Sequence, residues 1–296
     1  MRWPEALRKI RRVLLERRQR KKFFKQGVTL HQFGNYEISI PSNHATIGFM
    51  SRQPYRDLCI GIAAKQICEK YPFGTIVDIG ANIGDTASII ASYAKNKMIL
   101  IEASKYYFDF LQYNSKKFLN ETVLINSFIG EGTNESGELK HWGGTAHFQP
   151  DSKASGHLIK TKRLREVVDE NVTFIKIDTD GFDFKIISDS LDYLQQNLPA
   201  ILFEVGIRNL NDLESADDTF SKLRTIGYTH FLIWDDAGFY LSYTCSLQTL
   251  KDFNRYLFKI WSYEQTTKSI SNYDVLCLKA KDSDICNLIL DYYRKY

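Results

Sequence analysis

The sequence predicts one doubly wound α/β domain, in which helices cover both faces of a mostly parallel sheet of about seven strands, with a helical extension at the N-terminus. The chain of 296 residues is 44% apolar and 14% aromatic, which is enough for a large hydrophobic core. From residue 75 onward, nearly continuous apolar runs alternate with helix-like patterns, as expected for strands buried on both faces. A turn of small residues follows the first run, where sheets of this class approach a ligand.

The N-terminal segment, residues 1–26, carries 11 of the 39 Lys and Arg residues and two acids. Its apolar residues recur at helical spacing on one face: Trp3, Leu7, Ile10 and Leu14. Such a basic amphipathic helix can lie on an anionic membrane surface. The same stripe would also fit packing against its own domain or against a second subunit in a homodimer. Nucleic-acid binding is not expected, because no aromatic stacking platform is interleaved with the charges.

We assign residues 1–50 to the extension and a lead-in, and residues 51–296 to the folded domain. A short strand is expected at residues 36–41, where apolar and polar residues alternate, and a helix at 56–70. The strands of the main sheet are expected at 75–79, 98–102, 122–126, 172–178, 199–205, 230–235 and 273–280. The helices between them are expected near 86–95, 104–119, 183–197, 214–226 and 246–262. The segment between the third and fourth strands contains Gly, Ser and Pro and is expected to be a long loop over the crevice.

The cysteines and the apolar runs indicate the compartment. The five cysteines are scattered without any C-x-x-C pair, so neither a disulfide framework nor a zinc site is predicted. No apolar run approaches the roughly 20 residues that span a bilayer, and the first residues lack the apolar centre of a secretory signal. The body of the protein is therefore expected in the cytoplasm.

The stretch IVDIGANIGDTASII, residues 76–90, contains the turn that follows the first strand. Gly80, Ala81 and Gly84 would allow a ligand to touch the main chain there. Asp78 precedes them and would repel a pyrophosphate, whereas it suits a cationic group. Glu102 ends the second strand, where an acid can accept both hydroxyls of a ribose. A ligand with a ribose and a cation but no phosphate is S-adenosylmethionine. The alternative is that Asp78 caps a turn and the glycines only pack.

Four blocks of the sequence resemble the FkbM family of S-adenosylmethionine-dependent methyltransferases, over roughly residues 55–280. In chain order they read VDIGANIGDTAS, LIEASKYYFDFLQYN, FIKIDTDGFDFKII and PAILFEVG. The first block is shared by many methyltransferases, while the third and fourth are more specific. The resemblance implies a Rossmann-like class I methyltransferase sheet and makes residues 51–296 the methyltransferase domain. Family members O-methylate hydroxyl groups of macrolides, sugars and glycolipids, which implies the same reaction class here.

The resemblance also implies a set of cofactor-binding residues. Those in the turn and at the start of the next helix are Asp78, Gly80, Asn82, Gly84 and Thr86. Glu102 would hold the ribose, and Ser127 with Phe128 would border the adenine. Two positions depart from the family pattern. Ala103 follows Glu102 where the family usually has proline, and we keep it in the cofactor site. Asp180 replaces the glutamate of the K-I-D-x-E-G block, which shortens the carboxylate by one methylene.

The catalytic candidates come from the ends of the fourth and fifth strands. Methyl transfer to a hydroxyl is an in-line displacement that gains most from alignment, and a base adds about 10² to 10⁴ in rate. Alternate strand residues share a face, so Lys176 and Asp178 can point together. The cation stabilises ionised Asp178 and makes it a weaker base. We expect Asp178 to act as base or orienter, with Lys176 and Glu204 nearby. A buried structural ion pair, or a carboxylate that holds the methionyl amine, are the alternatives.

Histidines and further acids complete the candidates. Of the histidines in the expected loop, His147 is the choice for contact with the acceptor. The acids Asp178, Asp180 and Asp183 are of the kind that Mg²⁺ takes, but Lys176 offsets their charge and no metal site is assigned.

The reaction predicted from these features is S-adenosylmethionine-dependent O-methylation of a sugar, glycolipid or polysaccharide. The enzyme would work in the cytoplasm, and peripherally at the inner membrane face if residues 1–26 bind lipid. One rival interpretation is a metal-dependent glycosyltransferase that uses Asp178-Thr179-Asp180, and the other is a non-catalytic scaffold.

Overall fold

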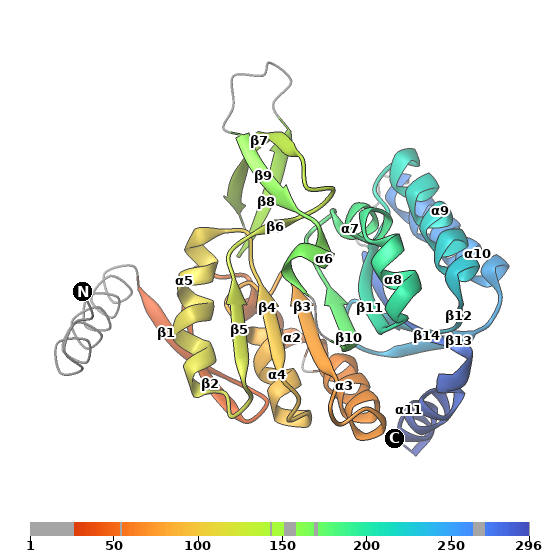
Figure 1. The fold of residues 1–296 in the computed structure, drawn as a ribbon, viewed down its shortest axis with the longest axis horizontal. Coiled ribbons are helices and arrows are strands. Elements are labelled where there is room, and N and C mark those ends of the chain that lie inside the picture. Colours follow the sequence, from red (N-terminus) through yellow and green to blue (C-terminus); the bar gives the residue numbers. More distant parts are fainter. Residues whose placement is uncertain are drawn as a thin grey trace.

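The computed structural model describes residues 27–53, 55–142, 144–150, 158–168, 171–262 and 270–295 (Figure 1). The predicted basic helix at residues 1–26 lies outside these ranges. Within them, no helix combines the length and the apolar character needed to cross a bilayer.

An eight-stranded sheet forms the centre of the fold, in the order β13-β12-β14-β11-β10-β3-β4-β5. All seven predicted strands belong to it: β3 (Thr75–Ile79), β4 (Met98–Ile101), β5 (Thr122–Ile125), β10 (Val172–Ile177), β11 (Ala200–Gly206), β12 (Tyr228–Asp235) and β14 (Asn272–Lys279). The eighth strand, β13 (Tyr240–Thr244), was not predicted and pairs antiparallel with β12. Most of its residues are exposed or half-buried, so it lacks the continuous apolar run that marks a buried strand.

The order of the strands reverses between β3 and β10. The strands from β5 to β11 are parallel, whereas β14 runs antiparallel to its neighbours β11 and β12. The chain builds the sheet from β3 through β4 to β5 and then returns to the other side of β3 with β10. The carboxyl ends of β3 and β10 therefore border the crevice in which sheets of this kind bind ligands.

Helices cover both faces of the sheet, which confirms the doubly wound α/β fold (Figure 1). One hydrophobic cluster packs four helices on one face: α3 (Leu58–Lys70), α4 (Asp85–Tyr93), α5 (Lys105–Asn114) and α11 (Ser283–Lys295). A second cluster packs four on the other: α7 (Asp183–Asp189), α8 (Leu191–Asn197), α9 (Leu210–Ile226) and α10 (Leu247–Ser262). The single helix predicted at 183–197 is two helices, because Ser190 between them leaves helical geometry with φ −110° and ψ 6°. Short helical segments lie at η1 (Ser115–Lys117), α6 (Leu164–Val167) and η2 (Ala280–Asp282).

The lead-in forms a hairpin of β1 (Val28–Phe33) and β2 (Tyr36–Pro41), followed by α2 (Thr46–Arg52). The strand predicted at 36–41 is confirmed as β2. Asn114 of α5 holds β2 in place, since its amide accepts from the backbone N–H of Ser39 at 2.9 Å and donates to the carbonyl of Ser39 at 2.9 Å. α2 extends across the proposed boundary at residues 50 and 51, and the division into extension and domain stays a prediction.

The expected long loop between the third and fourth strands is instead a small sheet, so the loop prediction was wrong. Its strands are β6 (Phe128–Ile129), β7 (Asn134–Trp142), β8 (Thr145–Pro150) and β9 (Leu158–Lys162), in the order β6-β9-β7-β8. Trp142 of β7 pairs with Thr145 of β8, and Gly144 between them has φ +95°. The Gly-Gly pair at residues 143 and 144 is a known signal for such a tight hairpin turn. This hairpin rises above the ends of the central strands (Figure 1).

A single methyl group added at the junction of β3 and β10 is expected to destabilise the protein strongly. Gly80 has φ +82°, and a Cβ there would lie 1.9 Å from the carbonyl oxygen of Asp178. We expect Gly80→Ala to lower the free energy of unfolding by about 3 kcal/mol, because backbone strain and overpacking add. Gly181→Ala is the matched control, since Gly181 has φ +112° but no atom of the described residues lies within 4 Å of its added Cβ. Equal urea midpoints for the two variants would contradict the close approach.

Candidate active site

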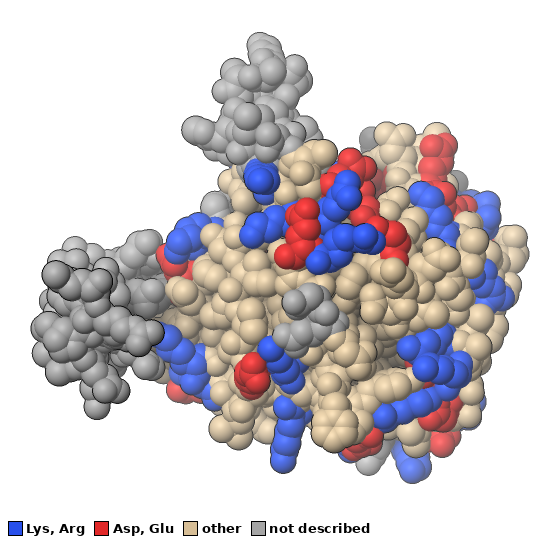
Figure 2. Space-filling view, viewed as in Figure 1, with Lys and Arg blue, Asp and Glu red and all other residues tan. Residues whose placement is uncertain are grey.

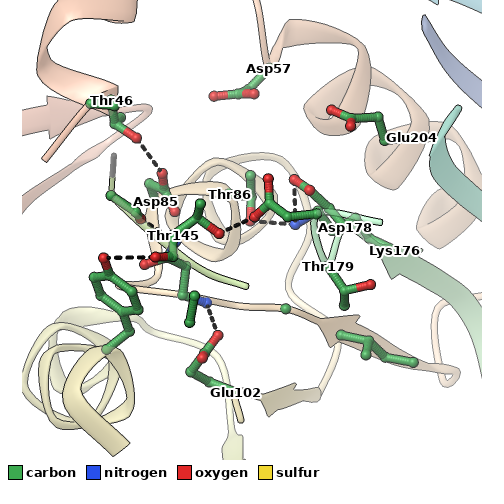
Figure 3. Close-up of a pocket in the computed structure, with 18 of the residues that line it drawn as sticks. Thr46, Asp57, Asp85, Thr86, Glu102, Thr145, Lys176, Asp178, Thr179 and Glu204 are labelled. Carbon is green, nitrogen blue, oxygen red and sulfur yellow. Dashed lines mark hydrogen bonds and ion pairs between the residues drawn. The ribbon is translucent and has the colours of Figure 1, made fainter. Parts of the chain in front are cut away.

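A cavity of about 880 Å³ lies at the carboxyl ends of β3, β4, β10 and β11 (Figure 3). It brings together most of the site residues predicted from the sequence: Gly80, Asn82, Thr86, Glu102, Ala103, Ser127, Phe128, Lys176, Asp178 and Glu204. Asp78, Ala81 and Gly84 are buried and do not line it. His147 lies on β8, opposite Lys140, but its side chain is outside the described part of the structure, so its role stays a prediction.

The turn after β3 is held open by backbone geometry. Gly80, Asn82 and Gly84 all have positive φ, and Gly84 is the N-cap of α4. The backbone N–H of Asn82 donates to Glu102 Oε2 at 2.9 Å, and that of Ser104 donates to Glu102 Oε1 at 2.7 Å. Burial raises the pKa of Glu102 to about 7, although both amide hydrogen bonds oppose the rise. Two main-chain donors therefore fix the Glu102 carboxylate at the edge of the cavity (Figure 3).

Asp78 lies below the turn, in a buried ion pair with Lys176. Lys176 Nζ is 3.3 Å from Asp78 Oδ1, and both side chains are almost inaccessible to solvent. The hydroxyl of Thr86 donates to Asp78 Oδ2 at 3.1 Å. Burial alone would lower the pKa of Lys176, but the nearby carboxylates raise it further, so the lysine stays protonated. Lys176 therefore balances the charge of Asp78 within the protein. Such a buried structural ion pair was one of the alternatives considered from the sequence.

Asp178 connects this buried pair to the cavity. Its Oδ2 lies 3.4 Å from Lys176 Nζ, and its side chain is 43% exposed. Its backbone N–H donates to the carbonyl of Ile79 at 3.0 Å, which extends the β3–β10 pairing by one residue. One end of the carboxylate is therefore held by Lys176, and the rest can accept hydrogen bonds from a ligand.

The acids that follow Asp178 are engaged with the protein. Asp180 has φ +55° and accepts a hydrogen bond from the hydroxyl of Thr145 in the β7–β8 hairpin. Asp183 accepts from the backbone N–H and the hydroxyl of Thr179 and from the backbone N–H of Gly181, each at 3.3 Å. Among the described residues, no group of three or more His, Cys, Asp or Glu is placed to hold a metal ion. The Mg²⁺ site considered for Asp178, Asp180 and Asp183 is therefore not supported.

Glu204 is a different kind of carboxyl group. It lies next to Asp274 across the β11–β14 pairing and accepts a hydrogen bond from the side chain of Asn272. Burial, together with the negative charges of Asp178 and Asp274, raises the pKa of Glu204 well above its ordinary value. The raised pKa favours the protonated form of Glu204, which can donate a hydrogen bond.

Several cavity residues were not singled out from the sequence. They come from the lead-in, from the residues directly before α3, from α5 and from the hairpin: His44, Thr46, Arg56, Asp57, Tyr107, Gly144 and Thr145. Asn82 Nδ2 donates to the carbonyl of Gly144 at 2.9 Å, so the hairpin turn covers the turn after β3. A Gly-Gly hairpin signal was present in the sequence, but nothing in it indicated that this hairpin would reach the turn.

Comparison with known proteins identifies the family of this chain. The sequence pattern of the methyltransferase FkbM domain matches residues 78–229. Among solved structures, an FkbM methyltransferase from Methylobacillus flagellatus is similar at 13% identity and a TM-score of 0.36, over 69% of this chain and 43% of that one. A putative transferase from Pyrococcus horikoshii gives 15% identity, coverage of 86% and 73%, and a TM-score of 0.45. TYW2 from M. jannaschii, solved with AdoMet, gives 11% identity, coverage of 84% of each chain, and a TM-score of 0.42.

This chain therefore spans less than half of the length of the FkbM structure from Methylobacillus flagellatus. No curated protein matches the sequence. The domain match alone spans more than half of the 296 residues, from Asp78 below the turn to the start of β12. The protein therefore belongs to the FkbM family of S-adenosylmethionine-dependent methyltransferases.

Proposed function

We propose that this protein transfers a methyl group from S-adenosylmethionine to a hydroxyl group of a sugar, glycolipid or polysaccharide. The observation that carries the proposal is a turn without side chains at Gly80 beside the fixed carboxylate of Glu102. The turn leaves room for a ligand against the main chain, and the carboxylate can accept hydrogen bonds from both hydroxyls of a ribose.

The rest of the cavity suits a cationic nucleoside. Ser127 and Phe128 line the side next to Glu102, and the Phe128 ring packs edge-on against Phe182 with centroids 5.3 Å apart, which provides an apolar wall for an adenine. Beyond the turn, Asp178 can accept a hydrogen bond from an ammonium group. When bound, S-adenosylmethionine supplies a methyl group activated by positively charged sulfur.

The charges of the cavity disfavour the rival glycosyltransferase. Carboxylates outnumber cations along its wall, so the cavity would repel the diphosphate of a nucleotide sugar. Asp180, which such a mechanism would need as a metal ligand, is already hydrogen-bonded to Thr145.

The far end of the cavity has the character of a sugar site. Ser271, Asn272 and Trp261 line it, and they combine hydroxyl and amide groups with an aromatic ring. The chain contributes by orientation, because holding the hydroxyl in line with the methyl group supplies up to roughly 7 to 11 kcal/mol of the barrier in well-aligned reactions.

Calorimetric titration tests the cofactor site. We expect the wild-type protein to bind S-adenosylmethionine, and Glu102→Gln to weaken binding by about 10-fold or more. The amide nitrogen would oppose a main-chain N–H, and the charged acceptor for the ribose would be lost. Glu121→Gln is the matched control, since that side chain is 72% exposed and lies outside the cavity. Equal affinities for all three proteins, or tighter binding of a nucleotide sugar with Mn²⁺, would refute the site.

Transfer of labelled methyl groups tests the reaction. We expect the protein to incorporate label from methyl-labelled S-adenosylmethionine into an O-methyl ether, in a panel of methyl glycosides and in glycolipid extracts of cells. Activity should persist in EDTA, because the three acids considered for Mg²⁺ have partners in the protein. Label found only on nitrogen or carbon would contradict the proposed acceptor class.

The proposed membrane association depends on residues 1–26. Because each Lys or Arg near an anionic surface contributes about 1 kcal/mol, the full chain should float with phosphatidylglycerol liposomes and not with phosphatidylcholine liposomes. A chain that starts at Gly27 should float with neither. If both proteins behave alike, the segment packs on protein instead, and gel filtration of the two would then report on a homodimer.

A further inference from the structure

Asp57 occupies a distinctive place in the cavity. It is the residue directly before α3 and lines the wall opposite Glu102, across the region occupied by Asp85, Thr86 and Asp178 (Figure 3). As the N-cap residue of α3 it could bond to the helix, yet its side chain makes no capping hydrogen bond. The carboxylate is thus half-buried at the cavity wall without serving the helix that positions it.

The other carboxylates of the cavity all have partners within the described structure. The pairs are Asp85 with Thr46, Glu102 with Asn82 and Ser104, Asp178 with Lys176, Asp180 with Thr145, Glu204 with Asn272, and Asp236 with Ser271. No hydrogen bond or ion pair to another described residue engages the carboxylate of Asp57 (Figure 3). Unlike these side chains, it is free to bond to a ligand.

The two acids named as catalytic candidates from the sequence, Asp178 and Glu204, are more engaged with the protein than Asp57. One oxygen of the Asp178 carboxylate is already engaged, because Asp178 Oδ2 lies 3.4 Å from Lys176 Nζ. The carboxyl group of Glu204 already accepts a hydrogen bond from the side chain of Asn272, and burial raises its pKa, which favours the protonated form. A base for the acceptor hydroxyl needs carboxylate oxygens that are open to the cavity, and of the three acids only Asp57 has a carboxylate with no bonding partner among the described residues.

We propose that Asp57 is the general base that takes the proton from the acceptor hydroxyl, an assignment that rests on the proposed O-methyltransferase function. In the step, the hydroxyl proton passes to the Asp57 carboxylate while an oxygen lone pair forms the new bond to the methyl carbon. The electrons of the broken carbon–sulfur bond stay on sulfur, which becomes neutral. The proton on Asp57 then passes to water. Asp178 acts as a positioning residue that accepts a hydrogen bond from the methionyl ammonium group.

The charges around Asp57 suit this role. Burial raises the pKa of Asp57 to about 6, and the negative charges of Asp85 and Asp178 act in the same direction. Arg56 beside it and Lys176 of β10 lower the pKa in part, and a bound sulfonium would lower it further. Because the base must be ionised, kcat measured at saturating S-adenosylmethionine should rise with pH up to about 6 and level off above it.

The test is the Asp57→Asn variant, assayed with the methyl glycoside or glycolipid fraction that accepts the most label. Asparagine has the same shape and is an equally good N-cap, so the fold is preserved. We expect kcat to fall by about 10² to 10⁴, the rise in activity toward pH 6 to disappear, and affinity for S-adenosylmethionine to stay within about threefold. Glu69→Gln, on the exposed end of the same helix, is the control and should match wild type.

The possible outcomes separate the two claims. If Asp57→Asn turns over within a few-fold of wild type and keeps the pH dependence, Asp57 is not the base, although the proposed function stands. If the variant loses cofactor affinity in place of turnover, Asp57 is a binding residue and the inference is wrong. If the wild-type protein binds S-adenosylmethionine but methylates no hydroxyl in any fraction, the proposed function fails, and the inference fails with it.

Discussion

The buried ammonium group of Lys176 is the constraint on which the site depends. An uncompensated charge in a protein interior costs several kcal/mol, so Lys176 requires the carboxylates of Asp78 on β3 and Asp178 beyond β10. Those two acids lie on the two strands between which the sheet reverses its order. The ion pair between Asp78 and Lys176 therefore links the carboxyl ends of β3 and β10. This close approach is also why Gly80 cannot carry a side chain, and why the turn after β3 offers bare main chain to a ligand.

Acids of similar chemistry take different roles along the cavity because their surroundings differ. Glu102 is fixed by two main-chain amides and is suited to hold hydroxyls. Asp178 is paired with Lys176, burial and neighbouring acids raise the pKa of Glu204, and the Asp57 carboxylate has no bonding partner among the described residues. From the sequence, we expected the negative charge of Asp78 to favour a cationic ligand directly. In the structure, the carboxylates that could favour a cation are those of the cavity wall. Asp78 does not line the cavity and affects it only through its ion pair with Lys176.

The sequence could predict the seven main strands because strands buried on both faces are continuous apolar runs. It could not predict β13, which lies at the edge with exposed residues, or the sheet from β6 to β9, whose strands interrupt their apolar pattern with polar residues. Most of the residues predicted for the cofactor site line the cavity, because they follow local turn and strand-end patterns. Asp57 was missed for a physical reason: the neighbours that distinguish it, Asp85 and Lys176, are distant in sequence, and only the folded chain brings them together.

A crystal structure with S-adenosylmethionine would test the arrangement most directly. The cofactor should place both ribose hydroxyls on the Glu102 carboxylate, its ammonium group at Asp178, and its methyl group toward the open space between Asp178 and Asp57. A ligand that leaves Glu102 and the turn at Gly80 untouched, or that binds in the opposite direction with its adenine near Asp57, would contradict the roles given to these residues.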